Sequence, residues 1–281
     1  MSNIEDLPDE IILKILKNMQ VGDLVFSWSK VSKRFRAISQ DKSLWEKVNV
    51  CDEKIQFGLV KRIVQNGCAY LSLNHCSVFG ANLSLSRTSQ LKHLDLSFSK
   101  VNLTILKTLL SSCHSLQNLS LANLTLDWET IYILSTQNGQ TLQVLNLGFC
   151  KGIIDAYDCV KWIVDNCRSL MQLNLNFTEL AEASVKYLIR HLTPNITKLN
   201  VGNLKWIDSE CIESLFNRCN KITALKFQSN SIDISTTILL VMTDLKRKCA
   251  NMEELDVSGN HRKEYLNGLF DKEIFLNQCQ I

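Results

Sequence analysis

The stretch LQVLNLGFC, residues 142–150, carries the pattern that decides the fold of this 281-residue chain. Its apolar residues fit [LIM]-x-x-L-x-[LVF], in which alternate residues point to one side of a short strand. Eight segments carry this pattern, the first of them only its L-x-L part, and their leading leucines are 23 to 30 residues apart. Those leucines are Leu71, Leu94, Leu119, Leu145, Leu173, Leu199, Leu225 and Leu255. The sequence therefore predicts a repeat protein.

Between the strand motifs the apolar spacing becomes helical, as in Val160, Ile163, Val164 and Cys167. Neither a short strand nor its helix can bury its apolar side alone, so successive repeats must stack. This is the pattern of the longer, cysteine-containing leucine-rich repeats. We predict an α/β fold with a curved solenoid at residues 68–281, built from about eight repeats and with a parallel sheet on its concave face. A linker or first cap helix is expected at 51–67, after an N-terminal helical domain at 1–50.

Composition excludes several classes of function. The chain is 46% hydrophobic and 21% charged, with a net charge of +3, which does not indicate a surface for nucleic acid or for an anionic membrane. The first ten residues lack a basic secretory leader, and no apolar run approaches the roughly 20 residues of a membrane span. We therefore expect a protein of the nucleus and cytoplasm.

The eleven cysteines include no C-x-x-C pair, and no histidine pair has zinc-finger spacing. In a reducing compartment such scattered cysteines are expected to be small buried residues. The five histidines are dispersed, and no G-x-S-x-G, P-loop or H-E-x-x-H motif occurs. We expect no enzyme activity, no cofactor and no metal.

The concave face of the predicted solenoid is lined by short polar residues, which leave room for another chain to approach. The residues predicted to contact a protein target there are Asn146, Asn174, Asn176, Asn200, Lys226 and Gln228. For any single one of them, a solvated sheet surface is the alternative. Bulky Phe98, Phe149 and Phe177 lie just beyond the strands. Four lysines, Lys198, Lys205, Lys221 and Lys226, are the only candidates for binding a phosphate on the target.

The N-terminal stretch LPDEIILKILKNM, residues 7–19, is apolar over about 240° of a helix, whereas a surface helix needs a stripe of only about 100°. A second helix follows, with an apolar stripe running from Leu24 to Ile38, and a third short helix, DKSLWEKV, adds Leu44 and Trp45. Such a small core is near the limit of independent stability. The surplus apolar surface is therefore covered by the repeats, in which case these helices are only a cap, or by another protein.

Three signatures occur in order in this region: Leu7-Pro8-Asp9-Glu10, Val31-Ser32-Lys33-Arg34-Phe35 and Ser43-Leu44-Trp45. Together they resemble an F-box. With the repeats, the chain resembles the F-box/leucine-rich-repeat proteins of the S-phase-kinase-associated type over nearly its whole length.

The resemblance implies a non-catalytic substrate receptor of a Skp–cullin–F-box ubiquitin ligase. Its F-box would bind the Skp adaptor, and through it the cullin and RING subunits, while the repeats hold a protein target, often a phosphorylated one, for ubiquitination and proteasomal degradation in pathways such as the cell cycle. The adaptor-binding residues implied by the motif are Leu7, Pro8, Ile11, Ile15, Leu24, Val25, Val31, Leu44 and Trp45. A cyclin-kinase-subunit accessory protein is a further implied partner, although the sequence leaves room for at most a partial repeat after the eighth. The alternative is a non-degradative binding scaffold whose N-terminal helices only cap the solenoid.

Overall fold

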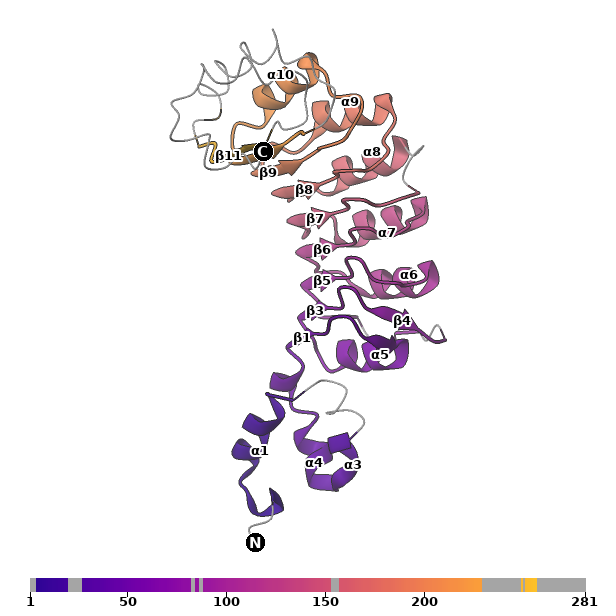
Figure 1. Ribbon diagram of the computed structural model, residues 1–281, viewed down its shortest axis with the longest axis vertical. Helices are drawn as coiled ribbons and strands as arrows, with labels where there is room; N and C mark the ends of the chain where they lie inside the picture. The colour runs from indigo at the N-terminus through magenta and orange to yellow at the C-terminus, as the bar shows by residue number, and fades with distance from the viewer. Residues whose placement is uncertain are drawn as a thin grey trace. The chain divides into compact units, whose positions relative to one another are not determined.

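The computed structural model describes residues 4–19, 27–81, 84–85, 88–152, 157–228, 249 and 251–256. The chain divides into two compact units, Met1–Leu116 and Gln117–Ile281, and each is described by itself (Figure 1). Both contain short parallel strands, and each strand that starts between residues 93 and 198 is followed by a helix, as the repeat pattern predicts.

The first unit begins with the elements of the N-terminal helical region. They are η1 (Ile4–Asp6), α1 (Asp9–Leu16), α3 (Ser29–Val31), α4 (Lys33–Ile38) and η3 (Lys42–Leu44). Helix α1 packs on α4, and their buried residues include Ile12 and Leu16 from α1 and Phe35 and Ile38 from α4. A small shared core therefore joins segments that lie more than 15 residues apart.

The rest of the first unit starts the repeat array. It consists of β1 (Lys47–Asn49), β2 (Lys54–Gln56), α5 (Phe57–Gln65), β3 (Tyr70–Ser72), β4 (Ser77–Phe79), β5 (His93–Asp95) and α6 (Leu103–Ser112). Strand β3 pairs in parallel with both β1 and β5, and β2 pairs with β4 in a separate sheet.

The second unit continues the strand–helix alternation. Its elements are β6 (Asn118–Ser120), α7 (Trp128–Asn138), β7 (Val144–Asn146), α8 (Tyr157–Asn166), β8 (Gln172–Asn174), α9 (Glu182–His191), β9 (Lys198–Asn200), α10 (Ser209–Arg218), β10 (Ala224–Lys226) and β11 (Glu254–Asp256). The strands form one parallel sheet, and consecutive helices from α7 to α10 pack on one another along one side of it.

The predicted register is confirmed in both units. Each leading leucine is the central residue of a strand, and partners align leucine to leucine, as in Leu119↔Leu145 and Leu145↔Leu173. None of the eight leucines is more than 7% exposed. The predicted α/β fold with stacked strand–helix repeats is thus the observed one.

The second N-terminal helix is predicted as one continuous element, but the structure has two helices, α3 and α4, in its described part. In its described part, Ser32 is extended, with φ −155° and ψ 170°, and separates α3 from α4. Its hydroxyl caps α4 by accepting a hydrogen bond from the Phe35 amide at 3.2 Å. A serine that caps one helix cannot continue the preceding one, which explains the break.

The end of DKSLWEKV also differs, because it forms strand β1 rather than a helix. The central residue of β1, Val48, is fully buried and aligns with Leu71 of β3. Pairing with the first repeat thus determines the structure of a segment whose local sequence is ambiguous.

Candidate functional site

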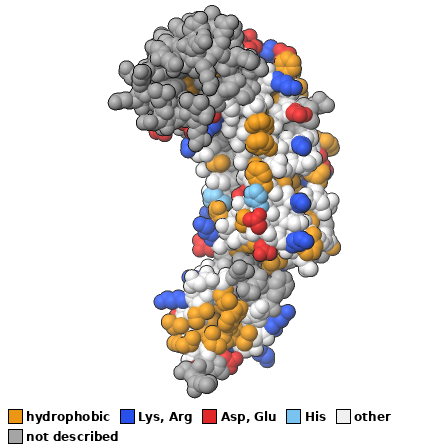
Figure 2. All heavy atoms as spheres, in the orientation of Figure 1, with side chains coloured by type: hydrophobic (Ala, Val, Ile, Leu, Met, Phe, Trp, Pro, Cys, Tyr) orange, Lys and Arg blue, Asp and Glu red, His pale blue; other side chains and the backbone are white. Residues whose placement is uncertain are grey.

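Hydrophobic side chains remain exposed on the N-terminal helices. In α1, Ile12 and Leu16 are fully buried, whereas Ile11 is 40% exposed and Ile15 is partly exposed. In α3, Val31 is 56% exposed. Figure 2 shows hydrophobic side chains gathered on this part of the chain. A single exposed isoleucine is ordinary, but several grouped in one place mark an interaction surface.

The other predicted adaptor-binding residues fall into three groups. Leu7 is partly exposed and Pro8 exposed, beside Ile11 at the start of α1. Leu24 and Val25 lie outside the described residues.

Leu44 and Trp45, by contrast, are 7% and 2% exposed, and the Trp45 indole donates a hydrogen bond to the Ser39 carbonyl at 2.9 Å. They stabilise the helical region from within and offer a partner almost no surface.

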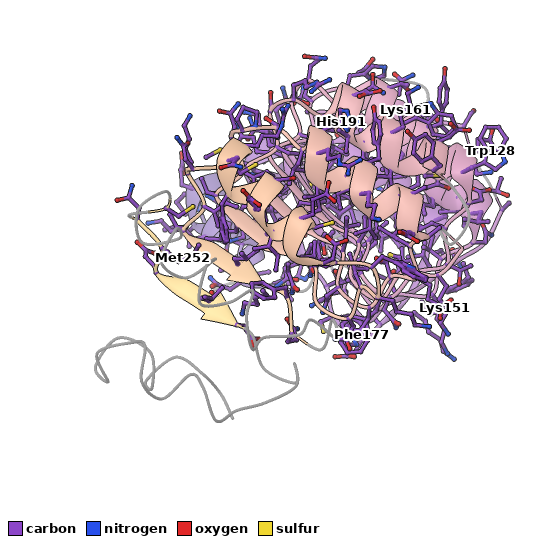
Figure 3. All side chains as sticks on the ribbon, turned by 90° about the horizontal axis from the view of Figure 1, so that it is seen from above. Trp128, Lys151, Lys161, Phe177, His191 and Met252 are labelled. Atoms are coloured by element: carbon purple, nitrogen blue, oxygen red, sulfur yellow. The ribbon has the colours of Figure 1, made fainter. Side chains whose placement is uncertain are left out.

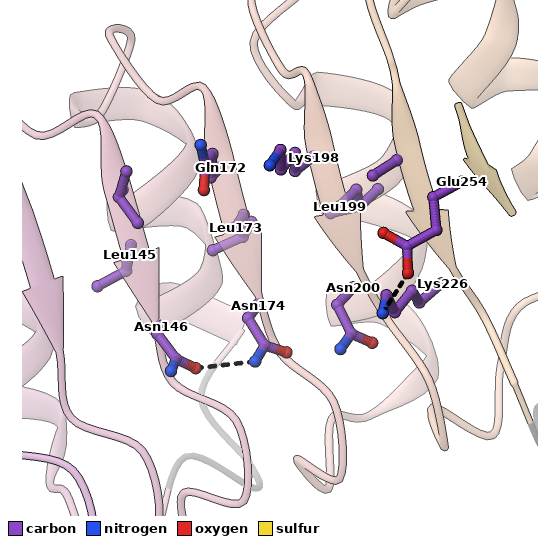
Figure 4. A pocket seen from close by; sticks show the side chains of 12 residues that line it. Leu145, Asn146, Gln172, Leu173, Asn174, Lys198, Leu199, Asn200, Lys226 and Glu254 are labelled. Carbon is purple, nitrogen blue, oxygen red and sulfur yellow. Dashed lines mark hydrogen bonds and ion pairs between the residues drawn. The ribbon is translucent and has the colours of Figure 1, made fainter. Parts of the chain in front are cut away.

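The second candidate surface is the sheet of the second unit, where a shallow pocket of about 260 Å³ crosses strands β7 to β11 (Figure 4). It is lined by three of the predicted target-binding asparagines, Asn146, Asn174 and Asn200, and by Lys226. The structure therefore brings these four predicted residues together on one face.

The asparagines form a chain of hydrogen bonds across neighbouring strands. Asn174 Nδ2 donates to Asn146 Oδ1 at 2.9 Å, and Asn146 Nδ2 donates to Ser120 Oγ at 2.9 Å. Each asparagine carbonyl also accepts the backbone amide two residues further on, as Asn146 does from Gly148 at 3.1 Å. These side chains are thus held in place before any partner arrives, which reduces the entropy lost on binding.

Asn176 and Gln228, the other two predicted target-binding residues, have a different environment. Asn176 is only 8% exposed, and its Oδ1 lies where a Cβ on Gly148 would be. Gln228 covers Gly202 in the same way. Both amide oxygens are buried without a conventional hydrogen bond, and their position over a glycine Cα fits a weak Cα–H···O contact. Asn176 therefore acts mainly within the sheet.

The four lysines do not form one anion-binding cluster. Lys226 Nζ pairs with Glu254 at 2.5 Å, and Lys221 Nζ donates to Asn195 Oδ1 at 3.2 Å. Lys198 also lines the pocket, whereas Lys205 follows strand β9. With Lys226 neutralised by Glu254, the pocket has little excess positive charge.

The bulky residues beyond the strands have an unusual backbone conformation. Phe149 and Phe177 have φ of 61° and 54° and are 40% and 48% exposed. Their rings stack with centroids 4.5 Å apart. In Figure 3, Phe177 lies on the opposite side of the unit from Lys161 and His191, which the helices carry. A left-handed conformation disfavours bulky side chains, and at the same corner of other repeats this chain has Asn123 and Asn203, which tolerate it better.

No catalytic arrangement is visible in the described part of the chain. The cysteines there are thiols rather than disulfides, and burial raises the pKa of Cys113 to about 11 and that of Cys167 to about 12. Such thiols are protonated and unreactive at neutral pH. Within the same ranges, no group of His, Cys, Asp or Glu side chains is arranged to hold a metal. Nor is any helix of the described ranges long and apolar enough to cross a membrane.

Two features of these surfaces escaped the sequence patterns. The stacking of Phe149 on Phe177 could have been inferred from their equal place in adjacent repeats. The contacts that Arg34 makes with the start of α1 and the segment before it have no such signal, because they join residues 25 to 29 positions apart.

Comparison with known proteins agrees with this division of the chain. The F-box domain model matches residues 4–47, and the SKP2 LRR domain model matches residues 58–261. Among solved structures, the chain is similar to the leucine-rich repeat-containing protein LegL7 from Legionella pneumophila, with 14% identity and a TM-score of 0.45. That match covers 74% of this chain and spans 62% of the length of LegL7.

F-box domains bind Skp1 in Skp1–cullin–F-box complexes, and F-box/leucine-rich-repeat proteins are typically non-catalytic adaptors. Since the SKP2 LRR match spans residues 58–261, far more than half of the sequence, the chain belongs to the SKP2 LRR domain family and carries an F-box domain before its repeats.

Proposed function

We propose that this chain is the substrate receptor of a Skp1–cullin–F-box ubiquitin ligase, and that residues 1–50, 51–67 and 68–281 are its F-box, linker and repeat domains. One observation carries the proposal: the region matched by the F-box model leaves Ile11 and Val31 exposed at 40% and 56%. A cap that only shielded the repeats would be expected to bury such side chains. The receptor itself performs no chemistry, since its role is to hold a target near a charged ubiquitin-conjugating enzyme.

In this proposal the adaptor covers the start of α1 and the exposed part of α3. Leu7, Pro8, Ile11, Ile15 and Val31 are the contact residues. Leu24 and Val25 extend the same surface according to the motif, and Leu44 and Trp45 support it from the core. Truncating one apolar anchor of this kind costs about 1 to 4 kcal/mol of binding free energy.

The target would bind across the sheet of the second unit. Asn146, Asn174, Asn200 and Lys226 offer polar groups that are already oriented by neighbouring strands, as Figure 4 shows. The exposed rings of Phe149 and Phe177 supply apolar contact surface at the ends of the strands. Because Lys226 is paired with Glu254, we infer that a phosphate on the target is not the main source of affinity. The chain would act in the nucleus and cytoplasm, in regulated protein degradation.

The adaptor contact is tested by co-purifying the full chain with Skp1 before and after changing Ile11 and Ile15 to Asp. The expected result is loss of Skp1 capture with unchanged far-ultraviolet circular dichroism. A control, Gln137→Asp on the exposed side of α7, adds one negative charge away from the F-box, against two in the Ile11, Ile15 variant, and should leave capture intact. Equal capture by wild type and the Ile11, Ile15 variant would contradict the proposal.

The target contact is tested by affinity capture from cells in which the proteasome is inhibited. Proteins that accumulate on the wild-type chain and are lost from an Asn146→Ala, Asn174→Ala double variant are candidate targets. Each is then tested for ubiquitination in a reconstituted complex with cullin and RING subunits, with and without phosphatase treatment. Ubiquitination that survives phosphatase supports phosphate-independent recognition. A captured set that does not differ between the two chains would argue against this face.

A further inference from the structure

Arg34 of α4 binds the first residue of α1 and the segment that precedes it through one guanidinium group. Its Nε and one terminal nitrogen both donate to the Asp9 carboxylate, at 2.8 and 2.5 Å. Nη1 donates to the Glu5 carbonyl at 2.5 Å, and Nη2 to the Leu7 carbonyl at 2.6 Å. One side chain therefore contacts three residues of a five-residue segment, from 25 to 29 positions away.

Hydrophobic burial does not hold this segment. Residues 4–10 include no buried residue, and Ile4 is itself 38% exposed. Pro8, the N-cap residue of α1, makes no capping hydrogen bond with its side chain. Contacts from Arg34, beside the hydrogen bond of the Leu7 amide to the Ile4 carbonyl at 3.3 Å, thus help to fix where the chain enters α1.

The segment held by Arg34 carries Leu7 and Pro8 and leads into Ile11, three residues of the proposed adaptor surface. We propose that Arg34 is a positioning residue for the adaptor: it holds the start of α1 in the arrangement that Skp1 binds, without contacting Skp1 itself. This inference rests on the proposed function. Without the contacts, residues 5–9 must be ordered at the moment of binding, which weakens the affinity.

The chemistry of the contact requires arginine. The planar guanidinium donates in several fixed directions, whereas a lysine ammonium is a single point charge. Arg34 and Asp9 are also 40% and 62% exposed in their side chains, so their ion pair contributes little to global stability. The effect of removing Arg34 should therefore appear in adaptor binding more than in the melting temperature.

The test measures binding of the full chain to immobilised Skp1, together with its thermal unfolding. Arg34→Gln should weaken affinity about tenfold while Tm changes little, and Arg34→Lys should recover only a small part of the loss. Asp9→Asn should weaken affinity about threefold, because the carbonyl contacts remain. Lys33→Gln removes the same charge from the exposed neighbouring residue and should bind as wild type does. Hydrogen exchange at residues 5–9 should rise in Arg34→Gln.

Three results would overturn the inference. Wild-type affinity in Arg34→Gln would show that Skp1 does not depend on the contact. Equal losses in Arg34→Gln and Lys33→Gln would reduce the effect to overall charge. If Arg34→Gln lowers Tm, and its affinity for Skp1 returns to the wild-type value when binding is measured at a lower temperature, the role of Arg34 is purely structural. If the wild-type chain does not bind Skp1 at all, the proposed function fails first, whereas strong wild-type binding with no effect of Arg34→Gln rejects this inference alone.

Discussion

The F-box helices and the repeats of the second unit differ in how completely they bury their aliphatic side chains. In the repeats, every strand puts its leading leucine at the same register, and the exposed large apolar residues there are almost all aromatic. In the F-box, the helices share a small core, and aliphatic Ile11 and Val31 remain exposed. A repeat buries its apolar face against the next repeat, whereas the F-box helices have no further copy to cover theirs.

This difference indicates where each region is sensitive to substitution. Substituting a buried leucine in a repeat should lower the free energy of unfolding, because each leucine packs against its neighbours on both sides. Substituting an exposed residue of the F-box surface should weaken Skp1 binding and leave the free energy of unfolding nearly unchanged.

The largest effect is expected from Leu173→Ala in β8. Leu173 is 2% exposed and aligns with Leu145 and Leu199 on either side, so truncation leaves a cavity and should lower the free energy of unfolding by about 3 kcal/mol. Ile11→Ala, at a residue that is 40% exposed, should cost less than about 1 kcal/mol. Denaturant unfolding followed by circular dichroism measures both. Similar losses for the two variants would remove the distinction between the regions.

The next effect concerns the close packing of neighbouring repeats. In Gly148→Ala, the added methyl would collide with Asn176 Oδ1 and approach Asn174 and Asn146, which should cost about 2 kcal/mol of stability through overpacking. At the corresponding place after the preceding strand, Ala122 already carries a methyl and is 4% exposed. Ala122→Gly should therefore cost about 1 kcal/mol or less.

A double variant sharpens this second prediction. If Asn176 is the group displaced, Asn176→Ser should restore much of the stability lost in Gly148→Ala, giving a coupling free energy of about 1 kcal/mol. If thermal unfolding shows that the stability losses of the two single variants add in the double variant, the added methyl collides with the backbone rather than with Asn176.

The repeats were more predictable from sequence than the F-box. All eight leading leucines are strand centres, because burial between repeats demands an apolar residue at that register and the pattern repeats it eight times. The apolar stripe predicts Ser32 inside one helix, since its role as a cap depends on where α4 begins. The local sequence does not predict strand β1, because Val48 is held in a strand by pairing with β3, which is a tertiary effect.

The candidate surfaces follow the same rule. The surplus apolar surface around Ile11 could be predicted because a helical wheel counts apolar residues directly, whereas Val31 was implied only by the resemblance to an F-box. Asn146 and Asn174 could be predicted because strand alternation fixes which side they face. The packing of Asn176 over Gly148 and the contacts of Arg34 join residues without a shared period. Sequence periodicity has no means of detecting such contacts.

Removing helix caps should have a smaller effect. Ser32 caps α4 in the F-box, and Asp127 caps α7 in the repeats by accepting the Thr130 amide at 2.9 Å and the Thr130 hydroxyl at 2.6 Å. Replacing either by Ala should cost about 1 kcal/mol of unfolding free energy. Because α4 carries Arg34, Ser32→Ala should also weaken Skp1 binding, whereas Asp127→Ala should not. Binding measured beside thermal unfolding separates the two, and an equal loss of Skp1 affinity would contradict the assignment of that surface to the F-box.

The smallest expected effect is a loss of stability at low pH, which the two regions should share. Hydrogen bonds from Ser43, by its side chain and its amide, lower the pKa of Asp41 below its ordinary value of 3.8. Burial raises the pKa of Asp208, but hydrogen bonds from Cys211 and the charge of Lys186 outweigh it and leave that pKa lowered as well. A carboxyl with a lowered folded-state pKa contributes stability that is fully present above the unfolded value and is lost as pH falls through the folded one.

Both contributions should therefore be complete at neutral pH and decline below about pH 4. Thermal unfolding of wild type, Asp41→Asn and Asp208→Asn between pH 7 and pH 3 checks this, since each variant should lose its difference from wild type as the pH falls. Asp41 is the more exposed of the two, so added salt should reduce its effect more than that of Asp208. A difference from wild type that stays constant down to pH 3 would mean that these carboxylates act through shape alone, in the F-box and in the repeats alike.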